Sequence, residues 1–189
     1  MIIVHLGPSN LPIRFNFGGG IERRMIEIAK QQTYAGHKVI IYSANDNSSC
    51  EDYEGVEIRN IACRWSQPLR RYEYLLKAIH DLRGQVVDIL HFHSIPEGAA
   101  LSNNIKAKKF LSYDYFIFLG GRRSPMYWWC RNALQKFSCL LPVSEYCLQS
   151  SNDYWDFNGI SMHKIYNGVN LEQFKPDQDL GKELSVLMG

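Results

Sequence analysis

Short apolar runs alternate with amphipathic stretches along nearly the whole chain of 189 residues. The apolar runs are typical of buried strands. The stretches between them repeat apolar residues at intervals of three and four, which is typical of helices that cover a sheet. This alternation predicts an α/β fold: a Rossmann-like, doubly wound, mostly parallel sheet with helices on both faces and right-handed crossovers. The expected strands are residues 2–7, 37–43, 55–61, 86–93, 115–119, 139–144 and 164–166, and the expected helices are residues 21–35, 69–82, 97–108, 125–137 and 146–155. Residues 44–54 are predicted to be a polar loop.

The triplet Gly18-Gly19-Gly20 stands directly before the first helical pattern, which begins at Ile21. Three consecutive glycines do not suit the interior of a helix or strand. A bare backbone that opens a helix offers unpaired N–H groups and the positive end of the helix dipole to an anion. Two interpretations stay open here: a phosphate or sugar contact at Gly19 and Gly20, and a flexible loop that lets strand and helix pack.

This glycine pattern does not fit a dinucleotide-binding protein. That fingerprint needs G-x-G-x-x-G directly after the first strand. Here Arg23 stands where the third glycine should be, and residues 8–17 separate Gly7 from the triplet. The Walker pattern G-x-x-x-x-G-K-[ST] is also absent from the sequence. A nucleotide-dependent oxidoreductase is therefore disfavoured.

Ligands on sheets of this kind bind beyond the carboxyl ends of the strands. The loops after three of the expected strands should therefore converge on one crevice, and they contain Gly18–Gly20, His93-Ser94 and Gly120-Gly121-Arg122. Arg122 and Arg123 could hold an anionic ligand by charge-assisted hydrogen bonds. They could also be the exposed start of a helix, although cations there oppose the helix dipole, and this mismatch favours an anion nearby.

Composition limits the compartment and the partners. The formal charge is +2, from 21 basic and 19 acidic residues, which argues against nucleic acid as a partner. The five cysteines form no C-x-x-C pair, so they are interpreted as reduced thiols and not as a disulfide framework or zinc site. The chain starts without a basic leader and has no run of about 20 apolar residues. We expect a cytoplasmic protein, with the inner membrane face as an alternative position.

A membrane-surface interpretation comes from Tyr127-Trp128-Trp129, which lie close to Arg122, Arg123 and Arg131. Basic residues with tryptophan on a helix suit a lipid interface. The alternative is that Trp128 or Trp129 packs on the sheet while the arginines are exposed. This alternative is preferred because the stretch lacks a long lysine-rich face.

Five stretches, in this order, resemble the N-terminal half of a retaining glycosyltransferase of the GT-B fold, family 4. They are Gly19–Arg23, Ala35–Val39, Asp88–Ser94, Val143–Tyr146 and Lys164–Pro176. The resemblance implies that residues 1–176 are a Rossmann-like domain that mainly holds the acceptor. Residues 177–189 would then be a linker and the first strand of a donor-binding domain that is missing here, so the fragment is expected to be inactive alone. The alternative is a stand-alone, non-catalytic domain that binds a glycan or recruits a partner.

The resemblance also implies roles for individual residues. Gly19 and Gly20 would let the backbone approach the donor pyrophosphate, and His93 would contact the transferred sugar, with Ser94 beside it. Many relatives carry a histidine before glycine after the fifth strand; here Leu119 precedes the glycines, so that role is vacant or passes to Arg122. Glu145 could bond within the cleft, but a glutamate at a helix start is stabilising without any function, and that interpretation is preferred.

The other histidines, His5, His37 and His91, are interpreted as structural. No cofactor or metal is expected, because no acidic or histidine cluster has ligand spacing in the sequence. The implied donor is a nucleotide sugar, and the acceptor is a sugar, a lipid-linked sugar or another small molecule. In the complete enzyme the leaving phosphate oxygen would help to take the acceptor proton, which explains why no general base stands out. Closure of the two domains would exclude water.

Overall fold

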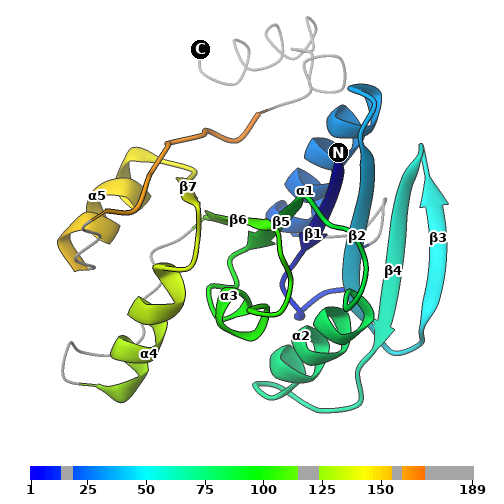
Figure 1. The fold of residues 1–189 in the computed structure, drawn as a ribbon, viewed down its shortest axis with the longest axis horizontal. Helices are drawn as coiled ribbons and strands as arrows, with labels where there is room; N and C mark the ends of the chain where they lie inside the picture. Colours follow the sequence, from blue (N-terminus) through cyan, green and yellow to red (C-terminus); the bar gives the residue numbers. More distant parts are fainter. Residues whose placement is uncertain (14–18, 115–123, 155–158, 169–189) are drawn as a thin grey trace, which may run out of the picture.

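The computed structural model describes residues 1–13, 19–114, 124–154 and 159–168, and these contain a seven-stranded sheet with the strand order β3-β4-β2-β1-β5-β6-β7 (Figure 1). The strands are β1 (Ile2–Leu6), β2 (Lys38–Asn45), β3 (Ser49–Tyr53), β4 (Val56–Ala62), β5 (Ile89–His93), β6 (Lys108–Tyr113) and β7 (Cys139–Pro142). Neighbouring strands run parallel, except that β3 pairs antiparallel with β4 at the sheet edge. The predicted α/β fold class is confirmed.

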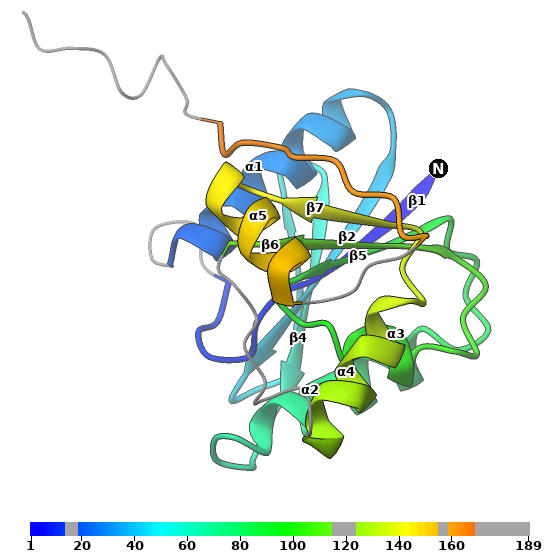
Figure 2. The same cartoon turned by 90° about the vertical axis from the view of Figure 1, so that its left-hand side faces the viewer.

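Helices cover both faces of this sheet (Figure 2). On one face lie α1 (Gly20–Tyr34) and α5 (Glu145–Tyr154), and on the other lie α2 (Arg70–Asp81), α3 (Gly98–Leu101) and α4 (Pro125–Leu134). This double cover is what a parallel sheet built from strand–helix repeats requires. Within the described residues, every helix is too short or too polar to cross a bilayer.

The two faces of the sheet are packed differently. The larger apolar core lies on the α2–α3–α4 face and includes fully buried side chains from β1 and β5: Val4, Leu6, Leu90 and Phe92. A smaller core joins α1 to β2 and β4 through Met25, Ile26, Ala29, Val39, Ile41, Val56 and Ile58. Side chains alternate along a strand, so His5, His91 and His93 fall on the opposite face from the larger core. The centre of the α1 face is therefore built from polar side chains.

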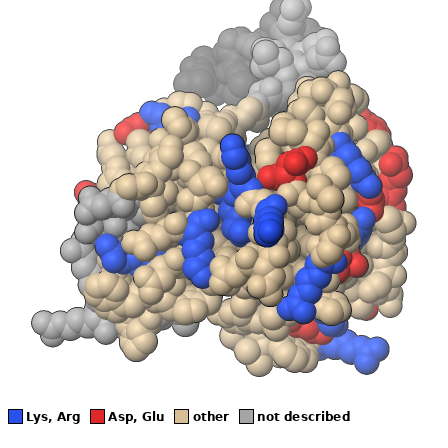
Figure 3. Space-filling model, viewed as in Figure 1, with Lys and Arg blue, Asp and Glu red and all other residues tan. Residues whose placement is uncertain are grey.

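Strand β3 is a correction, because residues 44–54 were predicted to be loop. Its residues are polar and mostly exposed, so they carry no apolar alternation. The strand forms through backbone pairing with β4, to which it is joined by a two-residue turn in which Glu54 (φ 51°) and Gly55 (φ 82°) both take positive φ, as tight hairpins require. Acidic side chains lie along this edge of the molecule (Figure 3), and charge on an edge strand discourages pairing with other chains.

Strand β6 is a second correction. The helix predicted over 97–108 is confirmed only over Gly98–Leu101 (α3), and the strand that pairs with both β5 and β7 begins at Lys108. The strand predicted over 115–119 lies outside the described residues. Because β6 ends at Tyr113, the residue at its carboxyl tip is Asp114.

The last predicted strand, residues 164–166, is also wrong. Residues 161–165 run extended beside β7, with hydrogen bonds from Leu140 N to Ser161 O and from Ile165 N to Pro142 O, and the one isolated β-bridge there joins Leu140 to Met162. The proposed boundary between residues 176 and 177 lies outside the described residues.

Candidate functional site

The N-terminus of α1 is open. Its N-cap, Gly19, is extended (φ −75°, ψ 176°) and makes no side-chain capping bond. Gly20 is exposed, and a Cβ there would meet nothing within 4 Å among the described residues. At Gly19 a Cβ would come within 2.7 Å of Glu22 Oε2. Uncapped N–H groups at a helix N-terminus can receive an anion or a sugar hydroxyl. Gly18 lies outside the described residues.

Arg24, in the first turns of α1, brings this helix against the tips of two strands. Its Nη1 donates to Asp114 Oδ1 at 2.5 Å and to Asn167 Oδ1 at 3.0 Å, and its Nη2 lies 3.5 Å from His93 Nδ1. The Arg24 side chain is only 10% exposed. Burial lowers the pKa of the guanidinium, and the Asp114 carboxylate acts in the opposite direction. The pair therefore keeps a cation at the carboxyl edge of the sheet.

Arg24 and Asp114 were missed by the sequence reasoning, which placed a guanidinium here from Arg122. Arg122 lies outside the described residues, and its role stays a prediction. A signal for Arg24 was present: it stands three residues after Ile21 and four before Ile28, on the inward stripe of the helix. A charged residue on such a stripe needs a partner.

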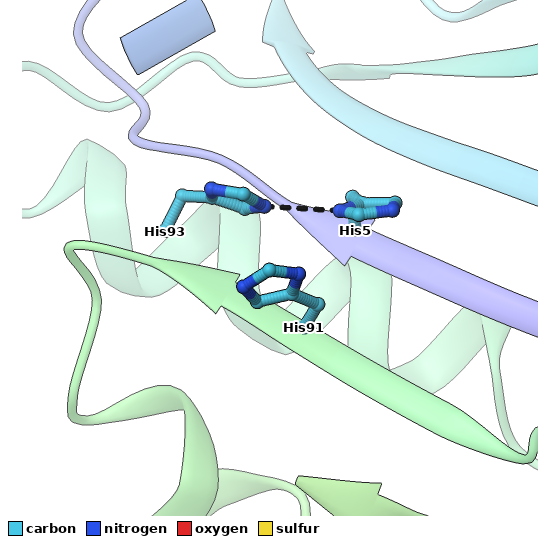
Figure 4. A group of neighbouring side chains, drawn as sticks. All are labelled: His5, His91 and His93. Atoms are coloured by element: carbon cyan, nitrogen blue, oxygen red, sulfur yellow. Dashed lines mark hydrogen bonds between the residues drawn. The ribbon is translucent and has the colours of Figure 1, made fainter. Parts of the chain in front are cut away.

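The β5 tip contains His93, which is fully buried, as is His5 of β1; His91 of β5 lies beside them and is 7% exposed (Figure 4). His5 Nδ1 lies 3.0 Å from His93 Nε2, His5 Nε2 lies 2.7 Å from Gln32 Oε1, and His91 Nε2 lies 2.7 Å from Ser112 Oγ. The strand register places His5 opposite His91. The three rings thus form one cluster that begins at the strand tip.

Burial keeps this cluster neutral. It lowers the pKa of His5 to about 4, against a smaller upward effect of the Gln32 hydrogen bond. It also lowers the pKa of His91 and His93 well below the usual 6.5, and the neighbouring histidines and Arg24 lower both further. Near pH 7 the three rings therefore serve as hydrogen-bonding groups without charge.

The same three histidines could hold a metal ion, because one nitrogen from each lies within 4.8 Å of the others. Spacing within the sequence did not show this group, since His5 comes from a different strand than His91 and His93. Neutral imidazole is the ligand form. The positively charged Arg24 guanidinium faces His93, and this argues against a metal ion there.

Ser94 follows His93 in an unusual backbone conformation. Its φ is +57°, a region that costs a residue with a side chain about 1–2 kcal/mol. The backbone is held there because Ser94 N donates to Ser112 O at 2.8 Å, and Ser94 Oγ lies 3.4 Å from Asp114 Oδ2. Such strained residues cluster at functional sites.

Arg24 thus links α1, which begins at Gly20, to His93, and Asp114 contacts both Arg24 and Ser94. That Gly19, Gly20, His93 and Ser94 bind one substrate stays a prediction. Glu145 is placed differently. It starts α5 with a half-exposed side chain, and its partners among the described residues are Lys164 and Gln149. The Lys164 ammonium lowers the pKa of Glu145. A substrate contact for Glu145 stays a prediction.

The tryptophans of α4 do not pack on the sheet, which corrects the preferred interpretation. Trp128 is 52% and Trp129 38% exposed, whereas Tyr127 and Cys130 are buried. The Arg131 guanidinium lies 5.5 Å from the Trp128 ring centroid, within the range of a cation–π contact.

This chain matches a known protein family and resembles solved structures in fold. The family model named Glycosyltransferase Family 4 matches residues 18–173. A search of curated proteins finds no match. At 17% identity and a TM-score of 0.65, the chain resembles a glycosyltransferase from Rickettsia africae ESF-5, over 98% of this chain and 49% of that one.

Two further solved structures are similar. The catalytic domain of starch synthase IV from Arabidopsis thaliana, bound to ADP and acarbose, has a TM-score of 0.61 and 14% identity, over 94% of this chain and 53% of that one. HepE of Anabaena, in complex with UDP, has a TM-score of 0.57 and 18% identity, over 98% of this chain and 50% of that one. At these identities the likeness concerns the fold, and the chain spans about half the length of each structure.

Proposed function

Because the chain belongs to glycosyltransferase family 4, we propose that it is the acceptor-side half of a retaining glycosyltransferase that moves a sugar from a nucleotide-sugar donor. The chain matches about half of each similar structure, and two of those structures contain ADP or UDP. The donor would be bound mainly by a second domain outside residues 1–189, so this chain alone is expected to turn over no nucleotide sugar.

One observation carries the proposal: Arg24, near the N-terminus of α1, joins this helix to His93 at the tip of β5. The amide groups of Gly19 and Gly20, at a helix N-terminus without a side-chain capping bond among the described residues, suit the pyrophosphate of the donor. The β5 tip, whose backbone is positioned by His93 and Ser94, would contact the transferred sugar. The chain's own residues would thus bind and orient the substrates, and orientation alone contributes several kcal/mol to a transfer reaction.

The test uses the complete gene product with UDP-glucose and ADP-glucose as probes, and measures release of the nucleoside diphosphate. Gly20→Val is the sharpest variant, because the added side chain would enter open space and leave the fold intact. We expect a loss of transfer of about 100-fold with an unchanged melting temperature. The matched control is His80→Gln on the exposed side of α2, which should transfer normally. Full activity of Gly20→Val would contradict the role of this turn.

The same experiment also tests the alternative that the chain is a non-catalytic domain. If the complete gene product turns over no nucleotide sugar but binds oligosaccharides on a glycan array, the chain is a recognition module. His93→Gln distinguishes the two further, since it should reduce transfer by an enzyme.

The acceptor class is proposed from α4. Two exposed tryptophans beside Arg131 suit the interface of a membrane, which is where a lipid-linked acceptor would be found. We expect the complete gene product to sediment with phosphatidylglycerol vesicles and Trp128→Ser to sediment less. Equal binding of both would remove this support for a lipid-linked acceptor.

A further inference from the structure

Four side chains form one hydrogen-bonded chain under α1. Arg24 Nη2 lies 3.5 Å from His93 Nδ1, His93 Nε2 lies 3.0 Å from His5 Nδ1, and His5 Nε2 lies 2.7 Å from Gln32 Oε1. Both ends are side chains of α1, and the middle belongs to β5 and β1. The chain therefore ties the helix to the two central strands of the sheet.

Arg24 and Gln32, the two end groups, determine which atom donates the proton in each hydrogen bond. A guanidinium can only donate, so His93 Nδ1 accepts and the proton of the neutral ring is on Nε2. That proton is donated to His5 Nδ1, which places the His5 proton on Nε2. The other end requires the same arrangement independently, because Gln32 Oε1 can only accept. With neutral rings, one set of tautomers satisfies all three bonds.

Arg24 is itself held in place. Asp114 Oδ1 accepts from Nη1 at 2.5 Å, and Asp114 is 19% exposed. Asn167 Oδ1 accepts from the same nitrogen at 3.0 Å. His91 lies below the bond between His5 and His93, as Figure 4 shows, and is fixed by Ser112. The His93 ring is thus enclosed by groups that are each anchored to another element.

We propose that Arg24 is a positioning residue: held by Asp114, it fixes the orientation and the Nε2–H tautomer of His93 at the tip of β5. The proposal rests on the function proposed above, in which this tip contacts the transferred sugar. Both ring nitrogens of His93 are engaged, so the residue acts as a fixed part of the site and not as a proton donor or acceptor. Loss of Arg24 would release the ring and the adjoining backbone of Ser94.

The same geometry opposes a metal ion at the three histidines. A metal on His93 Nε2 would require the ring proton on Nδ1, where it would face the N–H of Arg24. The Arg24 cation also repels a second positive charge at this distance. Binding of a metal is therefore an outcome that would overturn the proposal.

The first test is the tautomeric state of the histidines in the 189-residue chain, read from long-range ¹H–¹⁵N correlations of ring-labelled protein. We expect Nε2–H tautomers for His93 and His5 at pH 7. Arg24→Lys and Asp114→Asn should shift His93 toward a mixture of tautomers, whereas Arg83→Lys, an exposed control after α2, should change nothing.

Three results would overturn the proposal: an Nδ1–H or charged His93 in the unaltered chain, an unchanged His93 in Arg24→Lys, or stoichiometric binding of added Zn²⁺ that shifts all three histidines. The measurement on the unaltered chain decides the tautomer even if Arg24→Lys does not fold.

The second test is kinetic and uses the complete gene product with UDP-glucose and ADP-glucose. Arg24→Lys should lower kcat by about 10- to 100-fold with a smaller change in KM, because misplacement of a positioned group affects the transition state most. An unchanged kcat, or a histidine-like step in the pH profile of the unaltered enzyme, would contradict positioning. If the unaltered gene product shows no turnover, the proposed function fails while the tautomer result stands by itself.

Discussion

Mild acid should destabilise this protein, because three neutral histidines are buried in one cluster. The pKa of His5 falls from the usual value near 6.5 to about 4 on folding, and those of His91 and His93 fall well below 6.5. Between these values the unfolded chain binds protons that the folded chain does not. The stability is therefore complete above pH 6.5 and is lost progressively as the pH falls through that value toward 4.

The magnitude follows from proton linkage. One proton bound only in the unfolded state changes the free energy of unfolding by about 1.4 kcal/mol per pH unit. With an unfolded pKa of about 6.5, each buried histidine lowers the free energy of unfolding by roughly 1 kcal/mol between pH 7 and pH 5.5, and the three together by about 3–4 kcal/mol. This is a large part of the roughly 5–15 kcal/mol that stabilises an ordinary domain.

The assay is urea denaturation of the 189-residue chain at pH 7 and pH 5.5. His80 and His163 are exposed, so His80→Gln with His163→Gln is the matched control and should keep the full pH dependence. Glu97 opposes the effect of the histidines. Burial raises the pKa of its carboxyl group, so Glu97 stabilises the folded state increasingly as the pH falls. Glu97→Gln removes this opposing contribution. Equal free energies of unfolding at the two pH values would refute the neutral cluster.

Three substitutions test local geometry by the same assay. Ser94→Gly should raise the free energy of unfolding by about 1 kcal/mol, because a φ of +57° favours glycine; a lower value would contradict the strain. Gly98→Ala should lower it by about 2 kcal/mol or more, since a Cβ would lie 2.2 Å from Phe92 Cε1, and a neutral effect would show that the contact is wrong. Gly19→Ala should cost about 1 kcal/mol at the N-cap beside Glu22; a more stable variant would argue against that geometry.

The fold was predictable where burial is strong. Strands β1, β2, β4 and β5 carry continuous or alternating apolar residues, and such patterns identify strands directly. Strand β3 lacks this signal because it is a polar edge strand that forms only by pairing with β4. In β6, two lysines and a serine interrupt the apolar run, so a helix that ends at Lys108 fitted the local pattern equally well.

The site was predictable where one rule about topology suffices. The carboxyl ends of parallel strands meet, and this rule placed His93, Ser94 and the glycines before α1 in one predicted crevice. The contacts that complete the site join residues 69 to 90 positions apart, between Arg24 and His93, His5 and His93, and Arg24 and Asp114. Such pairs leave no periodic pattern in the local sequence. They depend on strand order and register, which appear only once the chain is folded.

These long-range contacts also explain how α1 is oriented on the sheet. Met25 and Ala29 pack on β2 and β4, and apolar contacts of this kind tolerate several arrangements. Arg24 and Gln32, about two turns apart, make directed hydrogen bonds to the histidine cluster, which a rotated helix could not make. Because Gly19 and Gly20 begin the same helix, its rotation sets the direction of their N–H groups. The buried bonds to His93 and His5 therefore fix the position of α1, and with it that of its N-terminus, relative to β5 and β1.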